Sequence, residues 1–310
     1  MHLLIPHAAA LSDISTNTLH QLSLPHLSQL LTRLTPTQRL GSDEYSLTPP
    51  HELAIAQAWG WRGADGAFPF AAHQAAADGV AVQGHAWGLL TPVHWHVGRD
   101  HISLLDPAVL ALDASESLQL LEAVRPLFES EGWLVAHGAG PHWYAAHDTL
   151  DGLPCASLDR VIGRNVDLWL PPHRQARLVR RLQSEVQMLL YTHPINNARE
   201  ARGALPVNSF WLSGCGRAQA ATDAPPIQID PTLRSPLMSN DWPAWAEAWR
   251  ALDAGPLAAL LAQLQRGEAV ALTLCGERHA QRFESLPKPL WQRIRDGWRA
   301  TPVPALLETL

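Results

Sequence analysis

The chain has 310 residues, of which 46% are hydrophobic and 17% are charged. This composition supports a sizeable buried core and excludes an intrinsically disordered chain. The formal net charge of -6 argues against an extended nucleic-acid-binding surface. The only lysine is Lys288, which excludes P-loop nucleotide binding and Schiff-base chemistry, because both need a positioned amine.

Cysteine usage and the start of the chain bear on where the protein resides. Cys155, Cys215 and Cys275 are widely spaced and form no CxxC pair, which is typical of a reducing compartment. Residues 1–10 hold a short apolar run with no basic residue before it, which favours a buried strand over a signal peptide. No apolar stretch approaches the roughly 18 residues that a membrane helix needs. We therefore expect a cytoplasmic protein with no membrane partner.

The first part of the chain predicts a strand followed by helices. Residues 3–5 are an apolar burst closed by Pro6, as in a buried first strand. Apolar residues in 24–34 recur at helical spacing, and Pro25 suits the first turn of that helix. A second helix is expected over residues 52–61.

From residue 85 the hydrophobic pattern changes to period two. Val93, Trp95 and Val97 alternate with polar residues, and residues 98–100 separate them from a second apolar segment at 102–105. This pattern predicts a β-hairpin.

The residues after this hairpin predict a mixture of helices and strands. Asp113 and Glu116 form a capping pair at the start of a helix. Further elements are expected as strands at 133–136, 142–146 and 166–170 and as a helix at 175–191. Together these elements indicate an α+β module.

The last part of the chain returns to an α/β pattern. Residues 218–240 are rich in Pro, Asp, Thr and Ser, which is typical of a linker or a long surface loop. Trp242, Trp245 and Trp249 share one helical face, and we expect them in the core rather than in an aromatic binding platform. The remaining expected elements are a helix through 257–264, a strand at 269–274 and a helix around 290–298.

The order of these elements predicts an α/β fold with an insertion. We expect a core domain of a sheet with flanking helices, built from residues 1–79 and 218–310. Residues 80–217 are expected to form an inserted α+β ligand-binding domain.

A basic segment lies inside this acidic protein. Between residues 160 and 202 the acidic residues are Asp167, Glu185 and Glu200, whereas the arginines are Arg160, Arg164, Arg174, Arg177, Arg180, Arg181, Arg199 and Arg202. Arginine forks bind phosphate and carboxylate oxygens, so the segment fits a phosphorylated small molecule or an acidic protein surface. The alternative is a helix with a basic solvent-exposed face, above all for the four arginines from 174 to 181.

A polar motif follows in the same region. His193, Asn196, Arg199 and Asn208 stand between Pro and Gly residues, where we expect a loop whose backbone converges on a ligand. An apolar run then leads into Gly214-Cys215-Gly216.

This motif resembles the substrate-domain motif of the archaeal-type, cofactor-independent phosphoglycerate mutases. That motif reads approximately His-Pro-x-Asn-x-x-Arg, then a Gly, an Ala-Asn pair and an apolar strand ending in Gly-x-Gly. Fainter similarities to the same family lie at 25–30, 141–143, 157–163, 247–264 and 273–277. The chain as a whole is also similar to bacterial RpfE-type regulatory proteins.

The resemblance implies an alkaline-phosphatase-like core interrupted by a substrate domain, as the element order also predicts. It further implies a phosphorylated ligand. The residues expected to bind it are Arg160, Arg164, His193, Asn196, Arg199 and Asn208.

The chain departs from the mutases where they bind metal. Active members need two divalent ions, Mn or Zn, which activate a serine nucleophile and hold the phosphoryl group. They supply an Asp after the first strand, where this chain has His7, and an Asp-His pair after the last core strand, where it has residues 275–277. Ser42 stands at about the place of the nucleophile. We therefore expect no catalytic metal pair and no cofactor.

Two hypotheses follow. The first is a non-catalytic mutase-like protein that binds a phosphorylated small molecule or a protein partner, in a regulatory role. The second is an active phosphomutase or phosphatase in which Ser42 reacts at a rearranged metal site. The residues available for that site are His7, Asp13, Asp43, Glu277 and His279.

Histidines offer a separate and weaker metal hypothesis. His94 and His96 lie two residues apart on one strand and so share a face, with His85 and His101 nearby. Such imidazoles could hold zinc or iron, whereas the alternative is an exposed hairpin face with Trp95 packed inward. A polar group at one helix end could serve acid/base catalysis, although such residues often share a helix by chance. Its members are Glu185, Tyr191 and His193.

Overall fold

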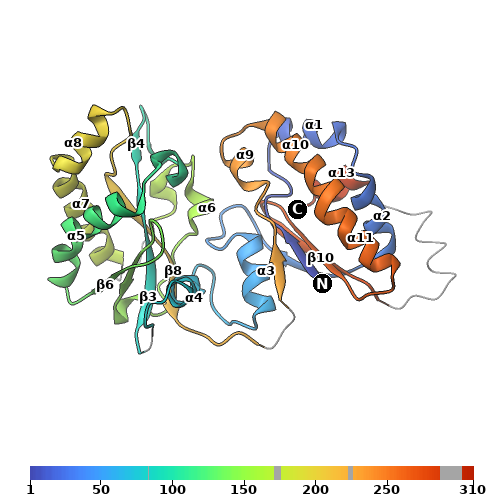
Figure 1. The fold of residues 1–310 in the computed structure, drawn as a ribbon, viewed down its shortest axis with the longest axis horizontal. Coiled ribbons are helices and arrows are strands. Elements are labelled where there is room, and N and C mark those ends of the chain that lie inside the picture. Colours follow the sequence, from blue (N-terminus) through green and yellow to red (C-terminus); the bar gives the residue numbers. More distant parts are fainter. Residues whose placement is uncertain (83, 171–175, 223–225, 287–301) are drawn as a thin grey trace. The chain divides into compact units, whose positions relative to one another are not determined.

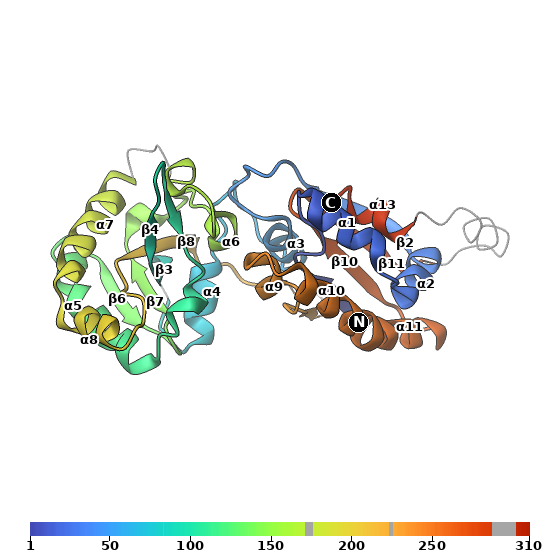
Figure 2. The ribbon, with the colours of Figure 1, turned by 90° about the horizontal axis from the view of Figure 1, so that it is seen from above.

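The chain folds into two compact units in a computed structural model that describes residues 1–82, 84–170, 176–222, 226–286 and 302–310. Unit 1 combines Met1–Gly60 with Ala221–Leu310, and unit 2 is the continuous segment Trp61–Ala220. Figures 1 and 2 show the two units from two directions.

The first boundary lies earlier in the chain than the sequence analysis placed it. Residues 61–79, expected in the core domain, belong to unit 2 because their helix α4 (Phe70–Ala77) packs on the sheet of that unit. Ala71 and Ala75 give α4 a small-residue face that lies close against Trp87 and Tyr144. The roles of the two units as core and ligand-binding domain stay predictions.

Unit 1 is built on a mixed five-stranded sheet with the order β2-β11-β10-β1-β9. β1 runs parallel to β9 and β10, whereas β11 and β2 extend the sheet in antiparallel pairing. Every residue of β1 and β10 is buried, as expected for strands covered on both faces. The strands are β1 (His2–Ile5), β2 (Thr35–Gly41), β9 (Ile227–Ile229), β10 (Ala271–Cys275) and β11 (His279–Glu284).

Helices flank this sheet, which confirms the predicted α/β class. Trp245 and Trp249 are fully buried in the hydrophobic core between helices and sheet, so the tryptophan stripe is core as predicted. The helix α3 contacts β2, β10 and β11, while α1 contacts α10 and α2 contacts α11 (Figure 1). The helices are α1 (Asp13–Gln21), α2 (Pro25–Arg33), α3 (Pro50–Ala58), α9 (Arg234–Met238), α10 (Trp242–Leu252), α11 (Ala258–Gln265) and α13 (Val303–Leu307).

Unit 2 contains an antiparallel sheet with the order β6-β7-β3-β8 and a separate hairpin, β4-β5. In the hairpin Trp95 pairs with Leu104 and Val97 with Ile102, which confirms the prediction from the alternating pattern. The strands are β3 (Ala86–Val93), β4 (Trp95–Val97), β5 (Ile102–Leu104), β6 (Leu134–His137), β7 (Trp143–Ala146) and β8 (Ser209–Arg217).

Helices cover both faces of this sheet. α5 (Ala114–Glu129) and α7 (Ala176–Tyr191) pack their apolar residues into one core with β3 and β8, while α4 packs against the residues of a second core. The side chain of Asp113 accepts a hydrogen bond from the Glu116 amide at 2.8 Å, so the predicted helix start is confirmed. Two short helices complete the unit, α6 (Leu158–Val161) and α8 (Pro194–Ala201).

Several sequence predictions of local structure are wrong. Residues 166–170 do not form a strand, because the side chain of Asn165 accepts from the Asp167 amide and starts a 3₁₀ turn at Val166–Leu168. Within the expected linker 218–240, β9 adds to the sheet beside β1, and α9 follows. The edge pair β2 and β11 was missed, since the polar alternation of β2 carries no strong apolar signal. The helix expected around 290–298 lies outside the described residues.

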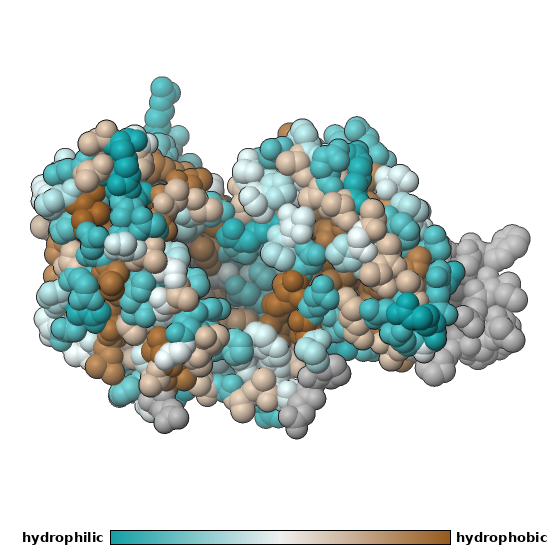
Figure 3. Space-filling view, in the orientation of Figure 1, coloured by the Kyte–Doolittle hydropathy of each residue, from teal (hydrophilic) through white to brown (hydrophobic). Residues whose placement is uncertain are grey.

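Within the described ranges no helix is both long and apolar enough to cross a membrane. Figure 3 shows hydrophilic and hydrophobic residues interspersed on the visible face of each unit.

Candidate functional site

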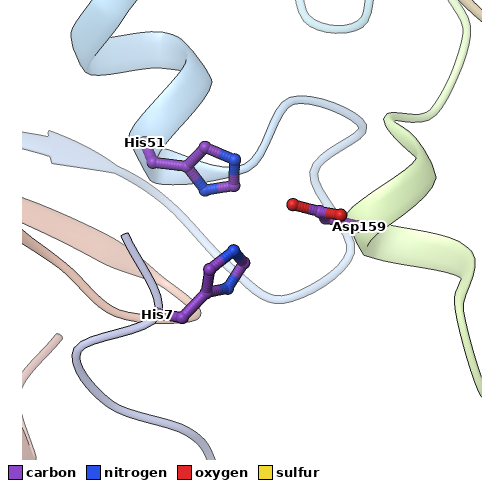
Figure 4. Close-up of side chains that lie close together, drawn as sticks. All are labelled: His7, His51 and Asp159. Atoms are coloured by element: carbon purple, nitrogen blue, oxygen red, sulfur yellow. The ribbon is translucent and has the colours of Figure 1, made fainter. Parts of the chain in front are cut away.

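The carboxyl end of β1 brings two histidines of unit 1 together. His7 follows β1 with a φ of +58°, in the left-handed region that a residue with a Cβ adopts at a cost. Its imidazole lies 4.9 Å from that of His51, measured between ring centroids, with the planes tilted by 55° (Figure 4). His51 stands in the first turn of α3 and is 9% exposed. Asp159, also drawn in Figure 4, belongs to unit 2.

The other residues named for a rearranged metal site each form contacts of their own within unit 1. Asp43 accepts a hydrogen bond from the Tyr45 amide at 2.9 Å, and Glu277 accepts one from the Leu11 amide at 3.0 Å. Burial, followed by the charge of Arg39, lowers the pKa of His279.

The donor set of unit 1 therefore does not fit a two-metal centre. Within the part of unit 1 that the structure describes, no three His, Cys, Asp or Glu side chains converge closely enough to hold one ion. A bridged pair of divalent ions needs more ligands than that, and carboxylates among them. We derive no catalytic step through such a pair.

Ser42 is exposed and directly follows the edge strand β2. Gly41, before it, has a φ of +99°, and a Cβ there would lie 2.1 Å from the carbonyl oxygen of Arg278. The backbone at this turn thus requires glycine. A serine hydroxyl needs an adjacent base or a metal to become a strong nucleophile.

The polar motif of unit 2 forms a helix where the sequence analysis expected a loop. α8 begins after His193, whose Nδ1 accepts a hydrogen bond from the Ile195 amide at 3.3 Å, and Pro194 occupies the first turn. This short helix, with proline in its first turn and Gly203 after its end, was not predicted because half of its eight residues are polar and they carry no apolar stripe. The loop prediction was wrong for this reason.

Asn196, in the first turn of α8, bonds to the backbone that precedes and follows this helix. It is 4% exposed and donates to the carbonyl oxygens of Leu190 and Val207, at 2.9 and 2.7 Å. Its own carbonyl accepts from the Val207 amide at 3.0 Å. Both amide protons of the carboxamide and one lone pair of its oxygen are thus used within unit 2.

Arg199 is completely buried and also bonded within unit 2. Its guanidinium donates to the Leu205 carbonyl at 2.8 Å, to the Leu110 carbonyl and to the Glu116 carboxylate at 2.7 Å. Arg202 contacts the same carboxylate from a half-exposed position. Two of the eight arginines therefore balance one glutamate in α5.

Asn208 secures the hairpin to β8. Its carboxamide accepts from the Trp95 amide at 2.7 Å and donates to the Trp95 carbonyl at 3.0 Å. Next to it, His94 Nδ1 donates to the Pro206 carbonyl at 2.9 Å, whereas His96 is exposed. The described residues around the hairpin supply no third ligand atom for a His94–His96 metal site.

The remaining arginines of the basic segment differ in exposure. Arg160 is buried on α6 at 2% exposure, and the Arg164 guanidinium lies 5.6 Å from the Trp169 ring centroid in a cation–π contact. Arg177 and Arg180 are exposed on α7. Arg181 forms ion pairs with Glu131 and Glu185, and Arg174 lies outside the described residues.

A buried carboxylate network in unit 2 escaped the sequence analysis. Asp78, 7% exposed in its side chain, accepts hydrogen bonds from Tyr144 Oη at 2.7 Å, His142 Nδ1 and the Ala139 amide at 3.0 Å, and Gln74 Nε2 at 3.1 Å. Burial acts to raise the pKa of Asp78, but these hydrogen bonds outweigh it and lower the pKa to about 2. Burial and the adjacent carboxylate raise the pKa of Tyr144. No pattern in the Ala- and Gly-rich stretch around Asp78 signals this network.

Comparison with known proteins finds similarity to solved structures alone, among them the two that follow. The sequence matches no family model, and no curated protein is similar to it in sequence. A cofactor-independent phosphoglycerate mutase from Thermoplasma acidophilum DSM 1728 is 13% identical, with a TM-score of 0.35 over 91% of this chain and 89% of that chain. The PH0037 protein from Pyrococcus horikoshii is 12% identical, with a TM-score of 0.44 over 91% and 86%. At these values the likeness does not decide the activity of this chain.

Proposed function

We propose that this protein binds a phosphorylated small molecule through unit 2, as a phosphoglycerate-mutase-like protein without the two-metal phosphoryl transfer. The proposal rests on the composition of residues 160–202 in unit 2. This segment contains eight arginines and three acidic residues. An anion attracted there would meet guanidinium groups, whose forks match phosphate oxygens.

The contacts within unit 2 divide the predicted ligand residues into two groups. The side chains of His193, Asn196, Arg199 and Asn208 bond to the backbone or to Glu116, which supports a role in building the unit. We propose Arg164 as the arginine that binds the phosphate, with Arg160 of α6 four residues before it in the sequence. The stacking of Arg164 on Trp169 supports this choice, because a stacked guanidinium is partly pre-oriented and loses less freedom when it binds.

The absence of metal chemistry is the second part of the proposal. It is supported by the residues at the carboxyl ends of β1 and β10, where His7 packs against His51 and Glu277 accepts the Leu11 amide. Neither position supplies the aspartate or Asp-His pair of the mutases that the sequence resembles.

Titration calorimetry of the full chain with 3-phosphoglycerate and with inorganic phosphate tests the binding. Loss of one charged hydrogen-bonding group removes about 1.5–3 kcal/mol, so Arg164→Ala should weaken binding about 10- to 100-fold. Arg177→Ala removes an exposed arginine of α7 and serves as the matched control, with an expected change below about threefold.

Two results would overturn the proposal. Equal weakening by both variants would indicate non-specific attraction of anions to a basic surface. Hydrolysis of a phosphomonoester that requires added Mn²⁺ or Zn²⁺ and disappears in Ser42→Ala would establish an active enzyme instead.

A further inference from the structure

Unit 1 contains a cavity of about 490 Å³ at the carboxyl ends of the parallel strands β1 and β10. Its walls come from the loop after β1, the first turns of α1, Glu277 after β10, and α13. All of these segments belong to unit 1. In open α/β sheets the carboxyl ends of parallel strands are where ligands commonly bind.

The size and walls of this cavity fit an organic molecule better than a bare ion. Its volume falls in the range of about 300–1,000 Å³ that is typical of small-molecule sites. The exposed side chain of Leu11 gives it an apolar lining, with the buried Leu19 and Leu307 behind that wall. Such surface favours a ligand with a hydrocarbon portion, because burying that portion removes apolar area from water.

The charge of the walls is negative. Asp13, Glu277 and Glu308 line the cavity, and no arginine or lysine does so among the described residues. His20 contacts Glu308 at 2.6 Å from an exposed position. The N-terminus of α1 is the opposing positive influence, and it is partly satisfied because Ser12 Oγ accepts from the Ser15 amide. Carboxylates on an apolar wall suit a group that is both cationic and a hydrogen-bond donor.

We propose that this cavity binds a small organic cation, a primary ammonium group carried on a short hydrocarbon body. The ammonium donates to the carboxylates of Asp13 and Glu277, and the hydrocarbon packs against Leu11. This ligand is distinct in charge and in place from the phosphorylated ligand of unit 2, so either proposal can fail without the other.

The test is calorimetric titration of the full chain with n-butylammonium chloride, n-butanol, sodium butyrate, ammonium chloride and magnesium chloride. We expect n-butylammonium to bind at least tenfold more tightly than n-butanol, with no binding of butyrate. Asp13→Asn and Glu277→Gln should each weaken n-butylammonium at least tenfold. Glu277→Gln keeps an oxygen that can accept the Leu11 amide, so the loop after β1 is preserved.

Glu247→Gln is the matched control, since Glu247 is an exposed glutamate on α10 of the same unit and does not line the cavity. It should bind n-butylammonium as the unchanged protein does. Circular dichroism of each variant verifies that the fold is retained. Equal binding of n-butanol, unchanged binding by both cavity variants, or binding of Mg²⁺ with none of n-butylammonium would each overturn the proposal.

Discussion

Replacement of Arg199 by alanine tests whether the polar motif of unit 2 builds the fold. Arg199 has no exposed surface and donates to two backbone carbonyls and to Glu116. Its loss leaves the carbonyl of the buried Leu110 unsatisfied, at about 1–3 kcal/mol, and removes the hydrogen bond to the carbonyl of the exposed Leu205. Removing one partner of a buried ion pair costs about 3–5 kcal/mol by itself. These contributions overlap, and we expect a total loss of about 4 kcal/mol.

The assay is urea unfolding followed by circular dichroism and tryptophan fluorescence. With a slope of about 2 kcal/mol per molar urea, a loss of about 4 kcal/mol lowers the midpoint of unit 2 by about 2 M. Arg202→Ala is the control, because Arg202 contacts the same carboxylate but its side chain is 50% exposed. That exposed pair should contribute about 0–1 kcal/mol.

Equal midpoints for the two variants would refute this reasoning. If Arg199→Ala kept the stability of the unchanged protein and lost phosphate binding, the guanidinium would have to reach a ligand in solution. The ligand role assigned by the sequence motif would then be right, and the structural role wrong.

Three further predictions follow from the two units. Burial, aided by the charge of Arg282, lowers the pKa of His2 to about 4. The free energy of unfolding of unit 1 should therefore fall by about 2 kcal/mol as the pH falls from about 6.5 to about 4, and His2→Val should flatten that part of a stability-against-pH curve. Asp78→Asn should destabilise unit 2 by about 2–3 kcal/mol at pH 7 in thermal unfolding. The difference in stability between this variant and the unchanged protein should shrink as the pH falls from about 4 towards 2, where the native carboxylate takes up its proton. A constant difference across that pH range would contradict the low pKa of Asp78. Gly214→Ala places a Cβ 2.8 Å from the Ala71 amide nitrogen at a φ of +64° and should cost about 2–4 kcal/mol, whereas Gly203→Ala, at a φ of +78° with open space around it, should cost about 1 kcal/mol.

The sequence predicted those elements whose hydrophobic period is clear. β1, α2, α5, α7, α10 and the β4-β5 hairpin all carry an apolar stripe or an alternation that local spacing alone makes visible. The edge pair β2 and β11 could not be found in this way, because both strands are mostly polar and lie about 240 residues apart in the sequence. The helix α8 was not predicted for a related reason, since its Arg199 bonds to Glu116 and to the Leu110 carbonyl, which lie 83 and 89 residues away in the sequence.

The candidate sites show the same division. The sequence identified His7 as a departure from the mutase pattern, and the fold then supplied His51 as its neighbour. The sequence does not show that Tyr144 and His142 bond to Asp78, because these residues are far apart along the chain and meet only in the folded unit. The cavity likewise joins α1 to α13, residues nearly 300 positions apart.

The path of the chain through the two units sets an order for folding during synthesis. Unit 2 is one uninterrupted stretch, so all of its strands are available once its last residue, Ala220, has left the ribosome. β1 must wait much longer, because both of its neighbours, β9 and β10, are translated after unit 2. Residues 1–60 of unit 1 therefore exist for a time with an apolar strand and two unpaired edges. An unpaired apolar strand of this kind is prone to aggregate until its partner strands are available.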